Sequence, residues 1–312
     1  MRVGFFTRKT LRLIISLFIF TILLYGLLYL STGDPAVSVL RKLGNQQITQ
    51  QALTKTRSSL GLDGTFITQY FNWLGQLLKG DFGVSFMTGD SVLKTIALQG
   101  VVTFKIIGYS FLFNFLFSIS FGTWIANHSV LKKGRSLLTV ILSFPSYWTS
   151  IVVIFIFGVQ LKWFPFVGSS DFKHLILPLV VCFLSEGLYL TKMVSDLLSL
   201  TALSQQQQIA KRRGLSWSVR WFYQVNENII ALISLYATSL IHLFSVTVMI
   251  EVIFSISGIG KLLIDAISVR DYPIIQGVSL LIAGMVFLIN YLSDLIVLLV
   301  DKRVSLEQGE QR

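Results

Sequence analysis

The feature that most restricts what this chain can fold into is a series of six long apolar stretches. An α-helix needs about 20 mostly apolar residues to cross the hydrocarbon core of a bilayer, and each stretch is about that long or longer. They lie at about Leu11–Leu30, Ile96–Ala126, Ser136–Leu161, Leu175–Leu197, Ile229–Phe254 and Gly277–Val300. The sequence therefore predicts an all-α integral membrane protein of about six transmembrane helices, forming a single membrane domain over residues 1–312.

The charge distribution supports a membrane protein and sets its orientation. Only 13% of the residues are charged, whereas a soluble domain carries about 25%. The net charge of +11 would suggest a nucleic-acid partner in a soluble chain, but here the basic residues form short clusters between apolar stretches, as in cytoplasmic loops. We therefore expect a lipid bilayer and no nucleic acid around the chain, with both termini cytoplasmic. The clusters are Arg2, Arg8, Lys9 and Arg12; Lys132, Lys133 and Arg135; and Lys211, Arg212, Arg213 and Arg220.

Two loops are long enough to hold structure of their own. The loop at 31–95 lies outside in this topology, and its segments Thr49–Leu60 and Gln69–Leu78 have helical composition or spacing. We expect short helices there near the outer interface, with Tyr70 and Trp73 at the level of the lipid headgroups. The loop at 199–227 lies inside and predicts a short helix that stops at Gly214.

Several polar residues fall inside the apolar stretches, where they are costly and should face the bundle interior or a wet cavity. Lys105, Asn290 and Asp294 are predicted to fix helix packing. For Glu186 and His242, a packing role and a place on a transport path stay equally open. Cys182 is alone and is read as a buried, inert thiol, and the three histidines are too scattered to indicate a metal site.

A set of short motifs in a fixed order gives a resemblance over nearly the whole chain. The chain is similar to the inner-membrane permeases of the peptide/nickel (Opp/Dpp/Nik) branch of bacterial type I ABC importers. The motifs that carry the resemblance are Gly33-Asp34-Pro35, Gly80-Asp81-Phe82-Gly83, Ser143-Phe144-Pro145, Ile176-Leu177-Pro178, Gly258-Ile259-Gly260 and Arg270-Asp271-Tyr272-Pro273. The resemblance implies the type I ABC importer permease fold.

The resemblance also implies roles for particular residues. The segment that couples the permease to its ATPases corresponds to Ala210, Arg213, Gly214 and Leu215. The gate corresponds to Glu251, Gly258, Gly260 and Asp271, while Glu186 and His242 are candidates for the translocation path because they are ionisable residues inside predicted spans. The chain departs from the family pattern at Gln205, Gln206, Arg212 and Ser257, which puts the individual coupling contacts in doubt.

The implied function is a permease subunit that imports nickel or metal chelates, or short peptides, across the bacterial cytoplasmic membrane. The chain has no ATP-binding motif, so we expect it not to be an enzyme and to bind no cofactor itself, with ATP used by partner subunits. The implied partners are a homologous second permease, two ABC ATPase subunits and an extracytoplasmic substrate-binding protein. The alternative is a proton-coupled secondary transporter that uses its intramembrane carboxylates.

Overall fold

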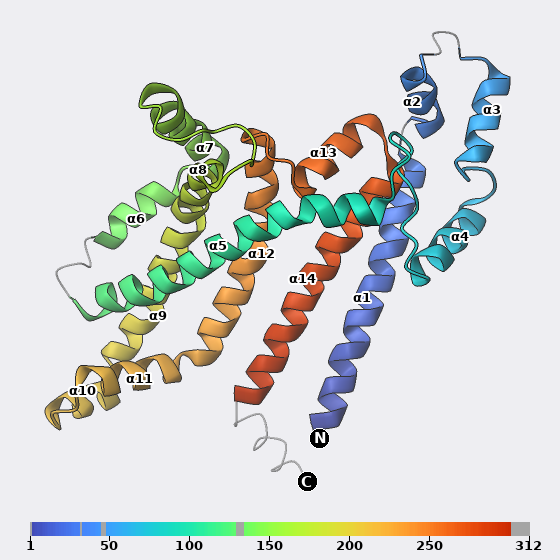
Figure 1. Ribbon diagram of the computed structural model, residues 1–312. Coiled ribbons are helices and arrows are strands. Elements are labelled where there is room, and N and C mark those ends of the chain that lie inside the picture. The colour runs from blue at the N-terminus through green and yellow to red at the C-terminus, as the bar shows by residue number, and fades with distance from the viewer. Residues whose placement is uncertain (1, 32, 45–47, 129–133, 301–312) are drawn as a thin grey trace. The chain divides into compact units, whose positions relative to one another are not determined.

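The structure is a computed structural model that describes residues 2–31, 33–44, 48–128 and 134–300, with side chains described for these residues except 2–5 and 134–137. Regular structure in these ranges is helical (Figure 1), apart from an isolated β-bridge between Val84 and Ser91. The basic residues Lys132 and Lys133 and the side chain of Arg135 lie outside the described part, so their clustering is not tested.

Five helical runs in the described ranges are long and apolar enough to cross a membrane. They confirm five of the six predicted stretches and extend most of them by several residues. They are α1 (Arg2–Leu30), α5 (Val92–Asn127), the continuous run of α8 (Phe172–Cys182), η3 (Phe183–Gly187) and α9 (Leu188–Ala202), α12 (Ile229–Ile253), and α14 (Tyr272–Val300). Within the fourth run, η3 is a π-helical turn.

The remaining predicted helix, Ser136–Leu161, is interrupted, so its prediction as one continuous helix was wrong. The chain forms α6 (Gly134–Leu142), leaves helical geometry, and resumes as α7 (Ser146–Val153) followed by the π-helical η2 (Ile154–Gln160). Pro145 explains the break, because proline has no N–H to donate and disfavours helical geometry in the residue before it. Its own backbone is extended (φ −62°, ψ 144°), and its carbonyl accepts from Thr149 N at 3.1 Å to start α7.

The helices predicted at Thr49–Leu60, at Gln69–Leu78 and before Gly214 are present as α3 (Gln50–Ser59), α4 (Phe66–Leu78) and α10 (Gln205–Arg212). The two loops also form α2 (Pro35–Lys42) and α11 (Trp217–Glu227), which the sequence analysis did not predict. A further short helix, α13 (Ile259–Val269), precedes α14. Tyr70 is buried against α1, where its hydroxyl lies 3.0 Å from Thr21 Oγ1 and its ring meets the ring of Tyr25. The position of Tyr70 and Trp73 at the level of the lipid headgroups stays a prediction.

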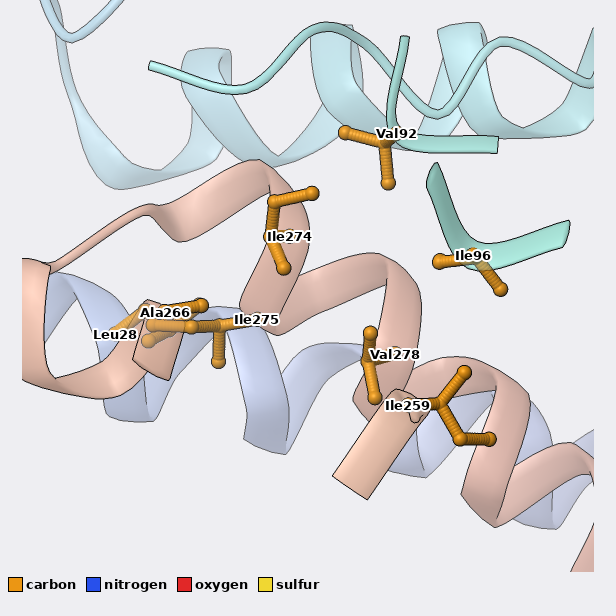
Figure 2. Close-up of a cluster of buried hydrophobic side chains, with 8 residues drawn as sticks. All are labelled: Leu28, Val92, Ile96, Ile259, Ala266, Ile274, Ile275 and Val278. Atoms are coloured by element: carbon orange, nitrogen blue, oxygen red, sulfur yellow. The ribbon is translucent and has the colours of Figure 1, made fainter. Parts of the chain in front are cut away.

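Contacts divide the chain into two compact units, which we describe separately. The first consists of Met1–Thr103 and Ser257–Leu288. Its core joins α1, the start of α5, α13 and the first half of α14 (Figure 2). The core residues are Leu28, Val92, Ile96, Ile259, Ala266, Ile274, Ile275 and Val278. Because these residues are far apart in the sequence, the core ties α1 and the start of α5 to α13 and the first half of α14.

The second unit consists of Phe104–Ile256 and Ile289–Arg312. Its core contains Ala126, Leu190, Val194, Leu198, Leu232 and Tyr236, from α5, α9 and α12. Helices α5 and α9 approach closely at Gly122, where an added Cβ would lie 2.8 Å from Val194 Cγ1 and 3.1 Å from the backbone oxygen of Thr191. Small residues at such crossings let helix backbones come together in membranes. That the two units act as one permease domain stays a prediction.

Candidate functional site

The predicted coupling segment is a short helix with defined ends. At its start, the Ser204 side chain accepts from Gln207 N, which satisfies one of the free donors of a helix N-terminus. At its end, Gly214 adopts a left-handed conformation (φ +71°), and its N–H donates to Lys211 O at 3.1 Å. Leu215 N then donates to Ala210 O at 3.1 Å, so the chain reverses direction within two residues.

The predicted coupling residues differ in exposure. Ala210 is buried against its own chain, whereas Arg213, Gly214 and Leu215 are exposed. Gln205 and Gln206 are exposed as well, so the departures from the family pattern lie on the accessible side of α10. The arrangement leaves a free face that is polar and basic for a partner, and uses Ala210 for internal packing.

Side-chain hydrogen bonds fasten the coupling segment to the rest of the second unit. Gln207 Nε2 donates to Arg220 O at 3.1 Å and joins α10 to α11. Gln224 Nε2 donates to Leu198 O at 2.6 Å and joins α11 to α9. Figure 1 shows α10 and α11 together at the end of α9, with α12 beginning where α11 ends. A displacement of α10 therefore reaches α9 through hydrogen bonds as well as through the chain.

Further hydrogen bonds tie α11 to α5. Trp221 Nε1 donates to Thr123 Oγ1 at 3.2 Å, and Asn127 Nδ2 donates to Gln224 Oε1 at 3.3 Å. Just after α11, Asn228 Nδ2 donates to Thr201 Oγ1 at 2.5 Å. Sequence reasoning missed these residues, although Gln224 and Asn228 stand four apart directly before an apolar helix, which is a readable signal for one polar face.

The structure brings Glu186 and His242 together, a pairing that the sequence analysis did not predict. Glu186 lies in the π-helical turn η3 and is only 4% exposed, and its Oε2 lies 3.9 Å from His242 Nδ1 on α12. The His242 side chain itself is 59% exposed, so the pair has one buried and one accessible member. Isolated π-helical turns are rare and occur frequently at functional sites.

The other polar residues of the predicted spans are placed differently. Lys105 and Asn290 are exposed in the single subunit and Asp294 is half-buried, so their role in fixing helix packing stays a prediction. Lys105 faces outward because the opposite face of α5 is the one that packs, through Thr103, Ile106 and Ile107. Glu251, in contrast, is fully buried in the last turn of α12.

The predicted gate residues of the first unit form a tight turn region. Gly258 caps α13 and Gly260 lies in its first turn, and both are buried. Ile259 N donates to Thr103 Oγ1 at 2.9 Å, which anchors the start of α13 on α5.

Asp271 joins the segment after α13 to the turn before α5. Its Oδ1 accepts from Phe86 N at 2.9 Å, and its Oδ2 accepts from the Ser85 hydroxyl. Ser85 Oγ in turn accepts from Met87 N and Thr88 N, so a single buried carboxylate organises the whole turn. Hydrogen bonds to a buried charged group are among the stronger ones in proteins.

Replacing Asp271 with alanine should destabilise the first unit by about 2–3 kcal/mol, because the buried donors of Ser85 and Phe86 lose a charged acceptor. Asp265→Ala is the matched control, since Asp265 is exposed and makes a 2.7 Å ion pair with Lys261, a contact that contributes about 0.5 kcal/mol or less. Thermal unfolding of the purified protein would measure both. Equal shifts for the two variants would show that the Asp271 contacts do not hold the turn.

An apolar cavity of about 600 Å³ lies in the second unit between α5, α11, α12 and the end of α14. Its lining is aliphatic and aromatic, with Trp221 and Tyr236 among the larger side chains. Specific small-molecule sites combine apolar walls with a few converging polar groups. This lining offers few such groups, so the cavity suits lipid or protein side chains better than a polar cargo.

Comparison with known proteins decides the family. The profile of the binding-protein-dependent transport system inner membrane component matches residues 118–306, and the profile of the N-terminal part of such membrane components matches residues 2–107. This chain belongs to that family. The permease is therefore a multi-pass inner-membrane subunit of an ABC importer, with ATP hydrolysis carried out by partner subunits and no cofactor of its own. Membership of this family decides against the alternative of a proton-coupled secondary transporter.

Two relatives show which importers the permease is similar to. One is the probable peptide ABC transporter permease protein y4tP of Sinorhizobium fredii, with 29% identity over 91% of this chain and 93% of the relative. Another is the nickel import system permease protein NikB of Staphylococcus aureus, with 29% identity over 97% of this chain and 92% of the relative. The similarity confirms the peptide/nickel branch suggested by the motifs.

Proposed function

We propose that this permease pairs with a homologous second permease to form the translocation path of an importer for nickel or metal chelates, or for short peptides. Two ABC ATPase subunits supply the energy, and an extracytoplasmic substrate-binding protein delivers the cargo. The equal similarity to a peptide permease and to a nickel permease supports both cargo classes. The basic clusters support a topology with both termini cytoplasmic.

The observation that carries this proposal is the attachment of α10 to its own subunit. A coupling element must offer a free face to an ATPase and must pass its movement to the membrane helices. Helix α10 offers exposed residues along its length, while Gln207 and, through α11, Gln224 link it to α9. Arg213, Gly214 and Leu215 are exposed, as contacts with an ATPase require, whereas Ala210 lies on the face of α10 that packs against its own subunit.

In this topology the 199–227 segment is cytoplasmic and the 31–95 segment is extracytoplasmic. The second of these, together with the turn held by Asp271 and the glycines Gly258 and Gly260, would form the outer docking and gating surface. Glu251 lies at the end of α12, four residues before the Ser255 turn that leads to α13. ATP binding would draw the coupling helices together and open the path outward, and hydrolysis would reset it.

The test is uptake in a deletion strain and its complement. Labelled nickel, with and without a metal-chelating carrier, is compared with a labelled dipeptide. We expect uptake of one cargo class to fall to background in the deletion and to return in the complement. Unchanged uptake of both would contradict the cargo proposal, while loss of both would indicate a path shared by the two classes.

A further inference from the structure

Several buried polar atoms in the second unit have no hydrogen-bond partner among the described residues. They include Ser110 Oγ, Asn114 Nδ2 and Oδ1, Glu186 Oε1, and Ser239 Oγ, besides Arg220 Nε and Thr247 Oγ1. Buried polar atoms are nearly always paired, and each unpaired one costs about 1–3 kcal/mol, more for a charged group. A concentration of them in one place points to an occupant such as water, an ion or a ligand group.

The first five of these atoms come from three elements and gather around Glu186. Ser239 on α12 lies beside the Glu186 carboxyl, and Ser110 on α5 lies beside Cys182, one turn before Glu186. Asn114, one turn after Ser110 on α5, reaches the same place. Its Oδ1 lies 2.6 Å from where a Cβ on Gly187 would stand. Glycine at 187 is thus what lets the Asn114 amide approach the π-helical turn.

Contacts within the subunit satisfy only part of this carboxyl group, since Glu186 Oε1 has no hydrogen-bond partner among the described residues. An ionised carboxylate in a dry interior is very costly unless it is paired and hydrogen-bonded. His242 lies 3.9 Å away, outside hydrogen-bond distance, and most of its side chain is exposed. Cys182, the other titratable neighbour, supplies no positive charge. The buried part of the cluster therefore has unused oxygen acceptors, and the one nearby group that can carry a positive charge, His242, lies at its accessible edge.

We propose that Asn114, Glu186 and Ser239, with His242 at the accessible edge, form a transient binding site for a positively charged group of the cargo. The carboxylate, amide and hydroxyl oxygens are the acceptors that a protonated amine or a partly hydrated metal ion would use. No group of three or more His, Cys, Asp or Glu side chains suited to a metal ion occurs in the described ranges. A cation would therefore be held weakly, as passage through a transport path requires.

This inference rests on the proposed import function but can be tested apart from it. The purified permease–ATPase complex, without binding protein and without a histidine tag, is heated in the presence of NiCl2 or of the dipeptide Ala-Ala. We expect one probe at millimolar concentration to raise the melting temperature of the wild type, and the rise to disappear in Glu186→Gln. The probe that acts identifies the cation as a metal ion or an ammonium group.

Asp196→Asn is the matched control, because Asp196 is a half-exposed carboxylate on α9 that pairs with Lys192 at 3.7 Å, away from the cluster. It should keep the probe-dependent rise. If neither probe stabilises the wild type, or if Glu186→Gln keeps the full rise, the proposal is overturned and the cluster holds ordered water only. This result does not depend on which cargo the cell imports.

Uptake gives the second readout. Glu186→Gln should lower cargo uptake about tenfold, the loss expected when one charge-assisted hydrogen bond is removed, with membrane abundance and ATP hydrolysis unchanged. A parallel fall in abundance or ATP hydrolysis would show a packing role and overturn the inference. If the complete deletion leaves uptake of both cargoes intact, the cargo proposal fails instead, and the melting experiment alone decides the site.

Discussion

Replacing Gly214 with valine is expected to reduce cargo uptake at least tenfold, towards the level of the deletion strain, while the partner ATPases continue to hydrolyse ATP. The backbone at this position has φ +71°, in the left-handed region. That region costs an L-residue about 1–2 kcal/mol, and a β-branched residue more. Nothing lies within 4 Å of an added Cβ, so the expected effect comes from the backbone turn and not from a side-chain clash.

Gly214→Asn distinguishes an effect of the backbone turn from an effect of the added side chain, because asparagine tolerates the left-handed region. It should retain most of the uptake, although its side chain is about as large as that of valine. Uptake, membrane abundance and co-purification of the ATPases would be measured for both variants. Equal loss in both would mean that any side chain at 214 disturbs the docking face, and full uptake in Gly214→Val would remove this turn from the coupling mechanism.

Replacing Gly122 with leucine is expected to remove most of the folded permease from the membrane. An added Cβ alone would lie 2.8 Å from Val194 Cγ1 and 3.1 Å from a backbone oxygen, so α5 and α9 would have to separate. Overpacking typically costs about 1–3 kcal/mol, and a backbone obstacle, which cannot rotate away, puts this case at or above the upper value. The same separation would strain the hydrogen bonds from α11 to α5 and α9.

Gly108→Leu is the control on the same helix, because nothing lies within 4 Å of a Cβ there. It should reach near wild-type abundance. Quantitative immunoblotting of membranes and thermal unfolding in detergent would compare the two variants. Normal abundance of Gly122→Leu would show that α5 and α9 do not approach as closely in the membrane as the structure indicates.

The transmembrane framework was readable from the sequence because hydrophobic length alone identifies a span. The same reasoning located α10 and its stop at Gly214, since helix composition followed by glycine is a local signal. An apolar stretch stays apolar across a helix break, so hydropathy did not predict the interruption at Pro145. The proline itself is the local signal that could have predicted it. The π-helical turn at Glu186 has no sequence signature that we can name.

The direction in which a side chain points was harder to predict from the sequence than the position of the helices. Lys105 and Glu186 both lie in apolar helices, yet one is exposed and the other buried, because packing partners on other helices decide which face turns inward. The polar residues Ser110 and Asn114 were also overlooked. They stand four apart in an apolar span, a spacing that places both on one helix face and would have marked the polar cluster.

The single thiol of the chain can report when water reaches the interior of the permease. Cys182 is fully buried, one turn before Glu186 and beside Ser110. An alkylating reagent can reach it only when water reaches the same interior, so the rate of alkylation in the unmodified protein follows the opening of that region. Since the sequence contains no other cysteine, every modified subunit records such an opening.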